Sequence, residues 1–196
     1  MTTTETTTPV EPTRLVDGRA LPVPGEWKVD PGHSSLAFEA RHAVVTRMRG
    51  RFRSFEGAFH IAETPEESWV EVTIDATSID TTHEIADQHL REENYLDVAN
   101  HPTLHFRSTA VRPVGENWQV DGDLTIRGIT RPITLDATFE GAVTLARGPR
   151  AKLAFSAQGQ FDRRDYDMTA NFALPGGGWV VGTGVRLHLD VEADLQ

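Results

Sequence analysis

Acid–base and metal chemistry have many possible donors in this 196-residue sequence, but no known arrangement of them. There are eight histidines and 29 acidic residues, yet H-E-x-x-H, G-x-S-x-G, G-x-x-x-x-G-K-S/T and G-x-G-x-x-G are all absent. His101 and His105 are four residues apart, but strand geometry with Pro102 between them does not give the paired ligands that a helix offers. The lack of cysteine excludes thiolate nucleophiles and zinc–thiolate sites. We therefore predict no enzyme, no cofactor and no metal site.

Three polar residues are candidates for contact with a ligand. Arg164 and its neighbour Arg163 offer planar, bidentate donation, which suits a phosphate. The alternative for this pair is a surface ion pair with Asp162 or Asp165. His42 falls on the apolar side of an alternating run, where it either donates to a ligand oxygen or is a core histidine with a protein partner.

The elements that must position these residues are strands. From Trp27 onward, apolar and polar residues alternate with period two, which is typical of strands with one buried face. Turn signals such as Pro65, Gly128 and Gly148 separate the runs. Eight runs are found, at about 36–42, 55–61, 70–77, 104–108, 118–127, 133–143, 153–161 and 185–193.

Two segments depart from this alternation. Residues 84–94, EIADQHLREEN, have helical spacing, and a second short turn is expected at 95–99, so one or two short helices interrupt the strands around 84–99. Residues 1–25 are rich in Thr and Pro and have too few apolar residues to offset the entropy of ordering. We expect a flexible tail over 1–25 and one domain over 26–196.

Eight long strands, each with one apolar face, favour a closed up-and-down antiparallel barrel, hence an all-β fold. The apolar face includes small residues: Ala40, Gly57, Ala76, Gly122, Ala137, Gly141, Ala157 and Gly159. Small inward residues suggest an open tunnel, and an eight-stranded barrel is about wide enough for one small ligand. The alternative is that the glycines relieve strain at barrel corners.

Charge and hydropathy limit the partners. The formal net charge is −10, which argues against a nucleic-acid binder and a polybasic membrane-surface binder. No run approaches the roughly 18 apolar residues of a membrane-spanning helix, and the first residues lack the features of a secretory signal. We expect a cytoplasmic protein with at most transient membrane contact.

Six strings, in order along the chain, resemble the YceI-like family. They are WKVDPGHSSLAFEARH at 27–42, GRFRSFEG at 50–57, DQHLR at 87–91, YLDVANHPTLHFRS at 95–108, GDLTIRGITRPITL at 122–135 and RRDYDM at 163–168. Two positions depart from the family pattern. Ala86 replaces a frequent arginine, and Asp167 replaces a frequent glycine.

The resemblance implies a lipocalin-like barrel, often dimeric, whose apolar tunnel binds a long isoprenoid chain such as a polyprenyl phosphate or an isoprenoid quinone. It implies binding, storage or transport without catalysis. The residues expected to bind the lipid combine the inward-facing set with the polar candidates: Phe38, His42, Phe55, Phe59, Ile74, Leu90, Tyr95, Phe106, Leu124, Ile126, Phe139, Phe155, Arg164 and Leu187.

Two other classes of function remain open on the sequence alone. One is an enzyme on the same barrel, for which His105 and His188 on the outward face offer a surface metal site. The other is a module that binds protein partners through the acidic stretches 63–71 and 84–97, although such stretches are usually solvated surface.

Overall fold

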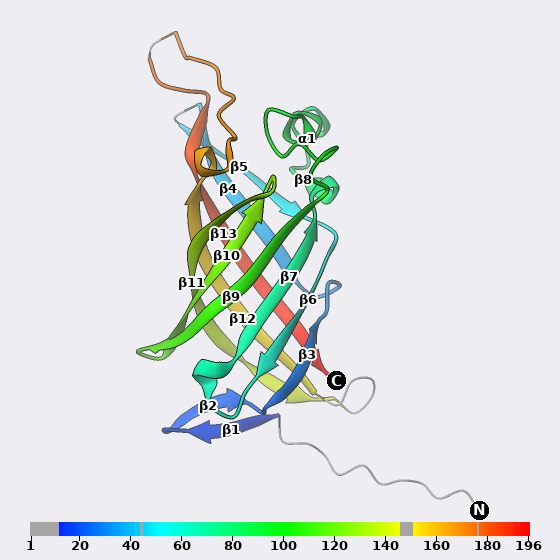
Figure 1. The fold of residues 1–196 in the computed structure, drawn as a ribbon, viewed down its shortest axis with the longest axis vertical. Coiled ribbons are helices and arrows are strands. Elements are labelled where there is room, and N and C mark those ends of the chain that lie inside the picture. Colours follow the sequence, from blue (N-terminus) through cyan, green and yellow to red (C-terminus); the bar gives the residue numbers. More distant parts are fainter. Residues whose placement is uncertain (1–11, 44, 146–150, 176) are drawn as a thin grey trace, which may run out of the picture.

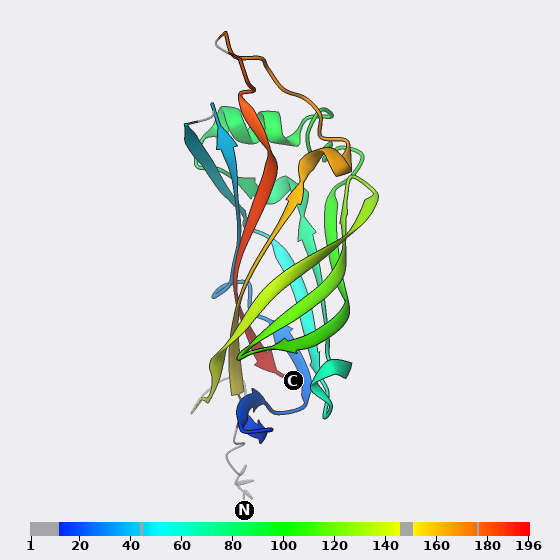
Figure 2. The same ribbon diagram turned by 90° about the vertical axis from the view of Figure 1, so that its left-hand side faces the viewer.

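The alternating runs form a closed antiparallel barrel of eight strand positions, which confirms the predicted fold class (Figures 1 and 2). The computed structural model describes residues 12–43, 45–145, 151–175 and 177–196. Its elements are β1 (Thr13–Val16), β2 (Arg19–Pro22), β3 (Gly25–Val29), β4 (Ser35–His42), β5 (Thr46–Phe52), β6 (Phe55–Ile61), η1 (Pro65–Glu67), β7 (Trp69–Asp75), η2 (Ala76–Ser78), β8 (Ile79–Asp80), α1 (Glu84–Arg91), β9 (Thr103–Val114), β10 (Asn117–Ile126), β11 (Ile129–Thr144), β12 (Ala151–Asp162), η3 (Arg163–Tyr166) and β13 (Val181–Leu195).

The last strand closes the barrel. One edge of β13 pairs along its length with β12, and the other edge pairs first with β4 and then with β3. Because β3 and β4 share this edge, they occupy one strand position, interrupted at Asp30–Ser34. There the Asp30 side chain accepts a hydrogen bond from the Gly32 backbone N–H at 3.0 Å. Two further strand positions are interrupted in the same way. β5 and β6 form one of them, and β7 and β8 form the next, because β6 is hydrogen-bonded to β7 and β5 to β8.

The upper end of the barrel in Figure 1 is covered by α1 and the chain that follows it. α1 is the one α-helix among the described residues, and the segment expected to form a second turn, 95–99, contains hydrogen-bonded turns without a helix. The Leu96 N–H donates to the Leu90 carbonyl at 3.0 Å, which folds this segment back on the helix. Leu96 is buried in the main core cluster.

The lower end is covered by a hairpin that the sequence analysis did not foresee. Residues 1–11 lie outside the described part of the chain, but β1 and β2, inside the expected tail, pair from Thr13 with Pro22 to Val16 with Arg19. Leu21 is buried against Trp118 and Ala137. One buried leucine in a four-residue strand is too short a pattern to reveal a strand, although its contact orders the hairpin.

In the described residues, no helix has the length and apolar character needed to cross a bilayer.

Candidate binding cavity

The barrel interior contains two adjoining cavities of about 150 and 140 Å³. The upper cavity lies beneath α1, and the lower cavity lies above the β1–β2 hairpin. Five apolar residues line both cavities and form the waist between them: Leu36, Val72, Phe106, Leu135 and Leu189. The two cavities therefore adjoin at this waist along the barrel, and together they are called the apolar passage.

The small residues of the inward face have two different roles. Ala40 lines the upper cavity, and Ala137 and Ala157 line the lower one, so these alanines do leave space. Three of the four inward glycines, Gly57, Gly122 and Gly159, do not, whereas a Cβ on Gly141 would have no atom within 4 Å. A Cβ on Gly122 would lie 2.4 Å from the Phe106 ring, and a Cβ on Gly159 would lie 2.5 Å from Leu135 Cδ2. These two glycines are covered by large side chains of the neighbouring strand, which thereby reach the waist.

The structure places most of the expected residues against the passage. The upper cavity is lined by Phe38, Ile74, Leu90, Tyr95, Phe106, Leu124, Ile126 and Leu187, and the lower one by Phe59, Phe106 and Phe155. The period-two alternation identified these wall residues, because successive side chains of a strand point to opposite faces and one face is turned inward. Leu90 and Tyr95 come instead from α1 and the following turn, as the sequence predicts for residues that cap one end.

Four expected residues lie elsewhere. His42 is exposed at the end of β4, opposite Val181. Phe55 is buried with Val29 and Leu36 in a separate cluster. Phe139 packs beside Phe155, with ring centroids 5.2 Å apart, behind the lining of the lower cavity. Arg164 is 60% exposed and forms an ion pair with Asp162 at 2.6 Å, which is the surface alternative.

Arg163, the neighbour of Arg164, is the charged residue of the upper cavity. It is 4% exposed and lines the cavity. Its Nε donates to the Gly182 carbonyl at 3.1 Å, and its Nη1 donates to the Met168 carbonyl. Among the described acidic residues, none forms an ion pair with it, and burial lowers the pKa of its guanidinium from the usual value. Because arginine stays protonated in proteins, this is a buried cation with no described carboxylate in ion-pair contact; Asp162, which itself pairs with Arg164, attracts it from a greater distance.

The sequence predicted Arg164 as the ligand contact, but Arg163 lines the cavity instead, and the geometry of η3 explains this difference. The strand alternation ends at Asp162, and a 3₁₀ turn rotates successive side chains by about 120°. Asp162 caps the turn by accepting from the Arg164 N–H at 2.9 Å. Asp167 ends it in the left-handed conformation, at φ 57°. A left-handed residue costs glycine no strain, and Asp167 adopts this conformation without being a glycine.

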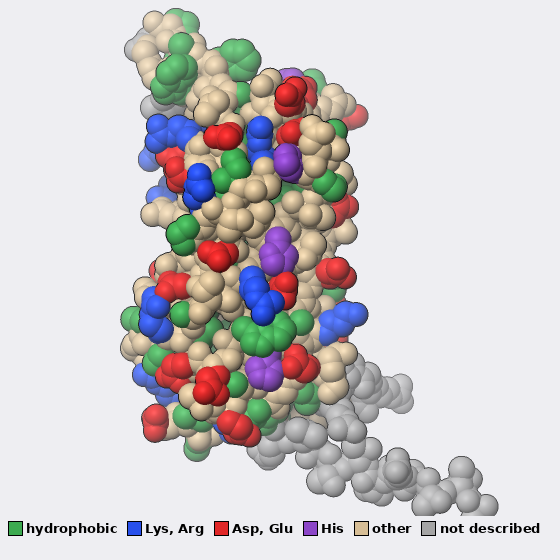
Figure 3. Space-filling model, in the orientation of Figure 1, with side chains coloured by type: hydrophobic (Ala, Val, Ile, Leu, Met, Phe, Trp, Pro, Cys, Tyr) green, Lys and Arg blue, Asp and Glu red, His purple; other side chains and the backbone are tan. Residues whose placement is uncertain are grey.

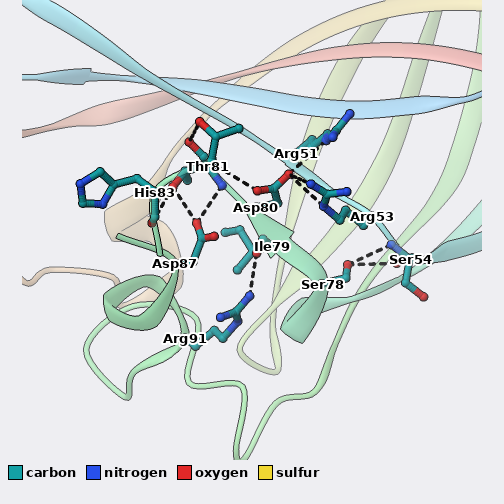
Figure 4. A network of polar contacts seen from close by, with 11 residues as sticks. Arg51, Arg53, Ser54, Ser78, Ile79, Asp80, Thr81, His83, Asp87 and Arg91 are labelled. Atoms are coloured by element: carbon teal, nitrogen blue, oxygen red, sulfur yellow. Dashed lines mark hydrogen bonds and ion pairs between the residues drawn. The ribbon is translucent and has the colours of Figure 1, made fainter. Parts of the chain in front are cut away.

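A polar network fastens α1 over the upper cavity (Figure 4). The buried carboxylate of Asp87 accepts hydrogen bonds from the Thr81 N–H at 2.7 Å and the Thr81 hydroxyl at 2.6 Å. Arg91 donates to the carbonyls of Thr77 at 2.9 Å and Ile79 at 2.8 Å. The string DQHLR thus acts mainly in holding the helix, so that Leu90 is directed into the cavity.

An acidic cluster at the lower end already has a cation. Asp30, His33 and Glu192 lie close enough to share a metal ion, but Lys152 Nζ is 2.6 Å from Asp30 and 3.4 Å from Glu192. Hydrogen bonds from Lys152 and His33 lower the pKa of Asp30 to about 2. On the outer wall, His105 pairs with Glu71 at 2.8 Å. In both arrangements the carboxylates already have protein partners.

Three comparisons place this geometry among known proteins. The YceI-like domain matches residues 27–193. A UPF0312 protein of Pectobacterium carotovorum is 34% identical over 155 residues, which cover 79% of this chain and 80% of that protein. The crystal structure of BcnA from Burkholderia cenocepacia has a TM-score of 0.70 at 19% identity, covering 84% of this chain and 98% of that one.

A second structural neighbour is a domain from Saccharophagus degradans, described as a polyisoprenoid binding domain implicated in plant cell wall breakdown. It has a TM-score of 0.64 at 16% identity and covers 87% of this chain and 98% of that one. A structural similarity at such low sequence identity shows only that the fold is shared. The domain match spans nearly the whole barrel, and the six strings noted in the sequence all lie within it. The chain belongs to the YceI-like family.

Proposed function

We propose that this protein binds a long-chain isoprenoid lipid in its barrel and stores or carries it without chemical change. The observation that supports this most strongly is the apolar passage, whose two adjoining cavities are lined by aromatic and aliphatic side chains from both halves of the barrel. The Saccharophagus domain, described as polyisoprenoid-binding, shares the fold and adds support.

The physical reason is the cost of exposing such a chain to water. Each exposed CH₂ costs about 0.8 kcal/mol, so a chain of many carbons essentially never leaves a bilayer unaided. An apolar passage removes most of this cost by offering surroundings like those of the bilayer. The preference for one lipid over another then depends on length, shape and the contacts of the polar headgroup.

The headgroup belongs at the upper end of the passage. Arg163 and Tyr95 are the polar side chains there, and Arg163 has donors that its two carbonyl bonds do not use. A polyprenyl phosphate would supply the missing counter-charge, whereas an isoprenoid quinone would supply only neutral acceptor oxygens. The phosphate is therefore the better match within the isoprenoid class.

The proposal is tested by uptake from vesicles that contain labelled polyprenyl phosphate. The wild-type protein is compared with Leu135→Trp, which fills the waist, and with Arg131→Gln on the exposed part of β11 as a control. We expect stoichiometric uptake by the wild type and the control, and a large loss for the filled waist. Equal uptake by a folded Leu135→Trp protein would contradict binding in the passage.

Location in the cytoplasm and formation of a homodimer stay predictions, which cell fractionation and sedimentation equilibrium test.

A further inference from the structure

The upper end of the barrel carries exposed apolar side chains on a projecting segment. Between η3 and β13 the chain extends beyond the barrel (Figures 1 and 2). Phe172 is 73% exposed and Trp179 58% exposed in this segment. Val45, in the neighbouring turn between β4 and β5, is 83% exposed. Together, Phe172, Trp179 and Val45 are called the apolar tip.

The apolar tip is held in place by hydrogen bonds at its base. The Val180 N–H donates to the Phe172 carbonyl at 2.9 Å, and the Ala43 N–H donates to the Val180 carbonyl. The Asn171 side chain donates to the Val181 carbonyl at 2.6 Å and accepts from the Val181 N–H at 2.9 Å. The β4–β5 turn and the projecting segment are therefore joined, which places the three apolar side chains on one end of the molecule.

A band of arginines lies beside the tip, on the outer face of β4, β5 and β13. Arg47, Arg49 and Arg186 share one carboxylate, that of Glu39, at 3.0, 3.6 and 3.4 Å. Further from the tip, Arg51 and Arg53 share Asp80. Five arginines thus face two carboxylates in a protein of net charge −10. Figure 3 shows basic side chains along the upper left margin, below the hydrophobic side chains of the projection.

The apolar tip and the arginine band adjoin the upper cavity. Arg163, Met168 and Val181 flank the projecting segment along the chain, and all three line that cavity. A surface on which this end rests would therefore lie next to the proposed headgroup position. On the other side of the same end, α1 and the chain that follows it carry the exposed residues Glu84, Glu92 and Glu93, so the charge at this end is unevenly distributed.

We propose that the upper end docks on a membrane that contains anionic lipids. The tip residues enter the interfacial region, where aromatic side chains are favoured, and the arginine band faces the anionic headgroups. The β4–β5 side tilts toward the membrane, and the side that carries Glu84, Glu92 and Glu93 turns away from it. This proposal goes beyond lipid binding in the barrel, because it states where and on what surface the protein docks.

Co-sedimentation with vesicles tests the proposal on the full-length protein. Vesicles of phosphatidylcholine alone are compared with vesicles of equimolar phosphatidylcholine and phosphatidylglycerol, at low and high salt. The variants are Phe172→Ser with Trp179→Ser for the tip, and Arg47→Gln with Arg49→Gln for the band. The matched control is Leu15→Ser with Val143→Ser, which removes two exposed apolar residues remote from the tip.

We expect the wild type and the control to bind the anionic vesicles, with binding that falls as salt rises because exposed charges are screened. Each test variant should reduce the partition coefficient on the order of tenfold. Trp179 is the most exposed tryptophan, so the fluorescence of the wild type should shift to the blue on binding, and Trp179→Phe should lose most of that shift.

Three results would overturn the proposal: no sedimentation with anionic vesicles, equal binding by the folded tip variant, or equal loss in the control. A second copy of the chain is the competing occupant of the tip. If the tip variant changes the sedimentation equilibrium of the free protein and leaves vesicle binding unchanged, the tip is a contact between copies instead. Uptake of lipid into the barrel is measured separately, so failure here leaves the proposed function standing.

Discussion

Asp87 receives two short hydrogen bonds from Thr81, one from its N–H at 2.7 Å and one from its hydroxyl at 2.6 Å. Both residues are buried. The pair connects α1 to the chain just after β8, and Figure 4 shows it near the bond from Arg91 to the Ile79 carbonyl. The stability of the cap over the upper cavity should therefore depend on this carboxylate as well as on Arg91.

Replacing Asp87 with Ala should loosen α1 more than the barrel. The change leaves the Thr81 N–H unpaired and the Thr81 hydroxyl with only its 3.3 Å bond to the His83 carbonyl, and should cost about 1–3 kcal/mol of the free energy of unfolding. Hydrogen exchange should become faster in 84–98 while β9–β13 keep their protection. Glu84→Ala, an exposed change on the same helix, is the control. Uniform loss of protection over the whole chain would show that the link does not act locally.

Replacing Arg163 with Met should change the preference among headgroups. The affinity for a polyprenyl phosphate should fall on the order of 10- to 100-fold, because a charge-assisted contact is lost. The affinity for the uncharged polyprenol of the same length should change little. Competition between the two lipids in uptake assays measures this ratio. Arg164→Gln is the matched control, and a larger effect there than at Arg163 would refute the assignment.

Replacing Gly122 with Ala should destabilise the barrel and obstruct the waist. The new Cβ would lie 2.4 Å from the Phe106 ring and 2.7 Å from the Arg107 carbonyl oxygen, so the ring must move. We expect a loss of about 1–3 kcal/mol in the free energy of unfolding, and reduced lipid uptake. Gly184→Ala is the control, because nothing lies within 4 Å of its added Cβ. Denaturant unfolding compares the two variants.

Lys152 should make stability depend on pH through Asp30. The pKa of Asp30 falls from 3.8 to about 2 in the folded protein, chiefly through its hydrogen bond to Lys152. A lowered carboxyl pKa stabilises the fold above pH 3.8, and this contribution is lost as the pH falls toward 2. Lys152→Met should therefore cost about 1–2 kcal/mol at neutral pH, and less near pH 2.

Denaturant unfolding at several pH values follows this difference between the wild type and Lys152→Met. Lys28→Met is the control, because Lys28 is the other of the two lysines in the sequence and its side chain is exposed. If the difference in the free energy of unfolding between the wild type and Lys152→Met stays constant from neutral pH to pH 2, Asp30 is not the responsible partner.

The sequence predicted the barrel because period-two alternation is a direct consequence of strand geometry and burial. It predicted the wall for the same reason, as Phe38, Leu124 and Leu187 illustrate. Parity alone does not tell which inward position stays open. Gly122 reads as empty space, but a neighbouring strand fills it with the Phe106 ring. The rotamer of a residue on another strand decides this, and a single sequence does not encode it locally.

Irregular backbone explains the other differences. Arg163 and Arg164 are adjacent, and only the 3₁₀ turn after β12 decides which one enters the cavity. His42 keeps the parity of β4, but it lies past the point where the barrel encloses its interior. The β1–β2 hairpin is ordered by the tertiary contact of Leu21 with Trp118. Such contacts join residues far apart in sequence, so composition indicated only a tail.

Whether the barrel holds an isoprenoid lipid is best measured by native mass spectrometry of the purified protein, followed by organic extraction and identification of the lipid. We expect one adduct per barrel that extracts as a prenyl lipid, with an anionic headgroup in preference to a neutral one. A barrel that is empty when purified and also fails to take up polyprenyl lipids from vesicles would contradict this expectation.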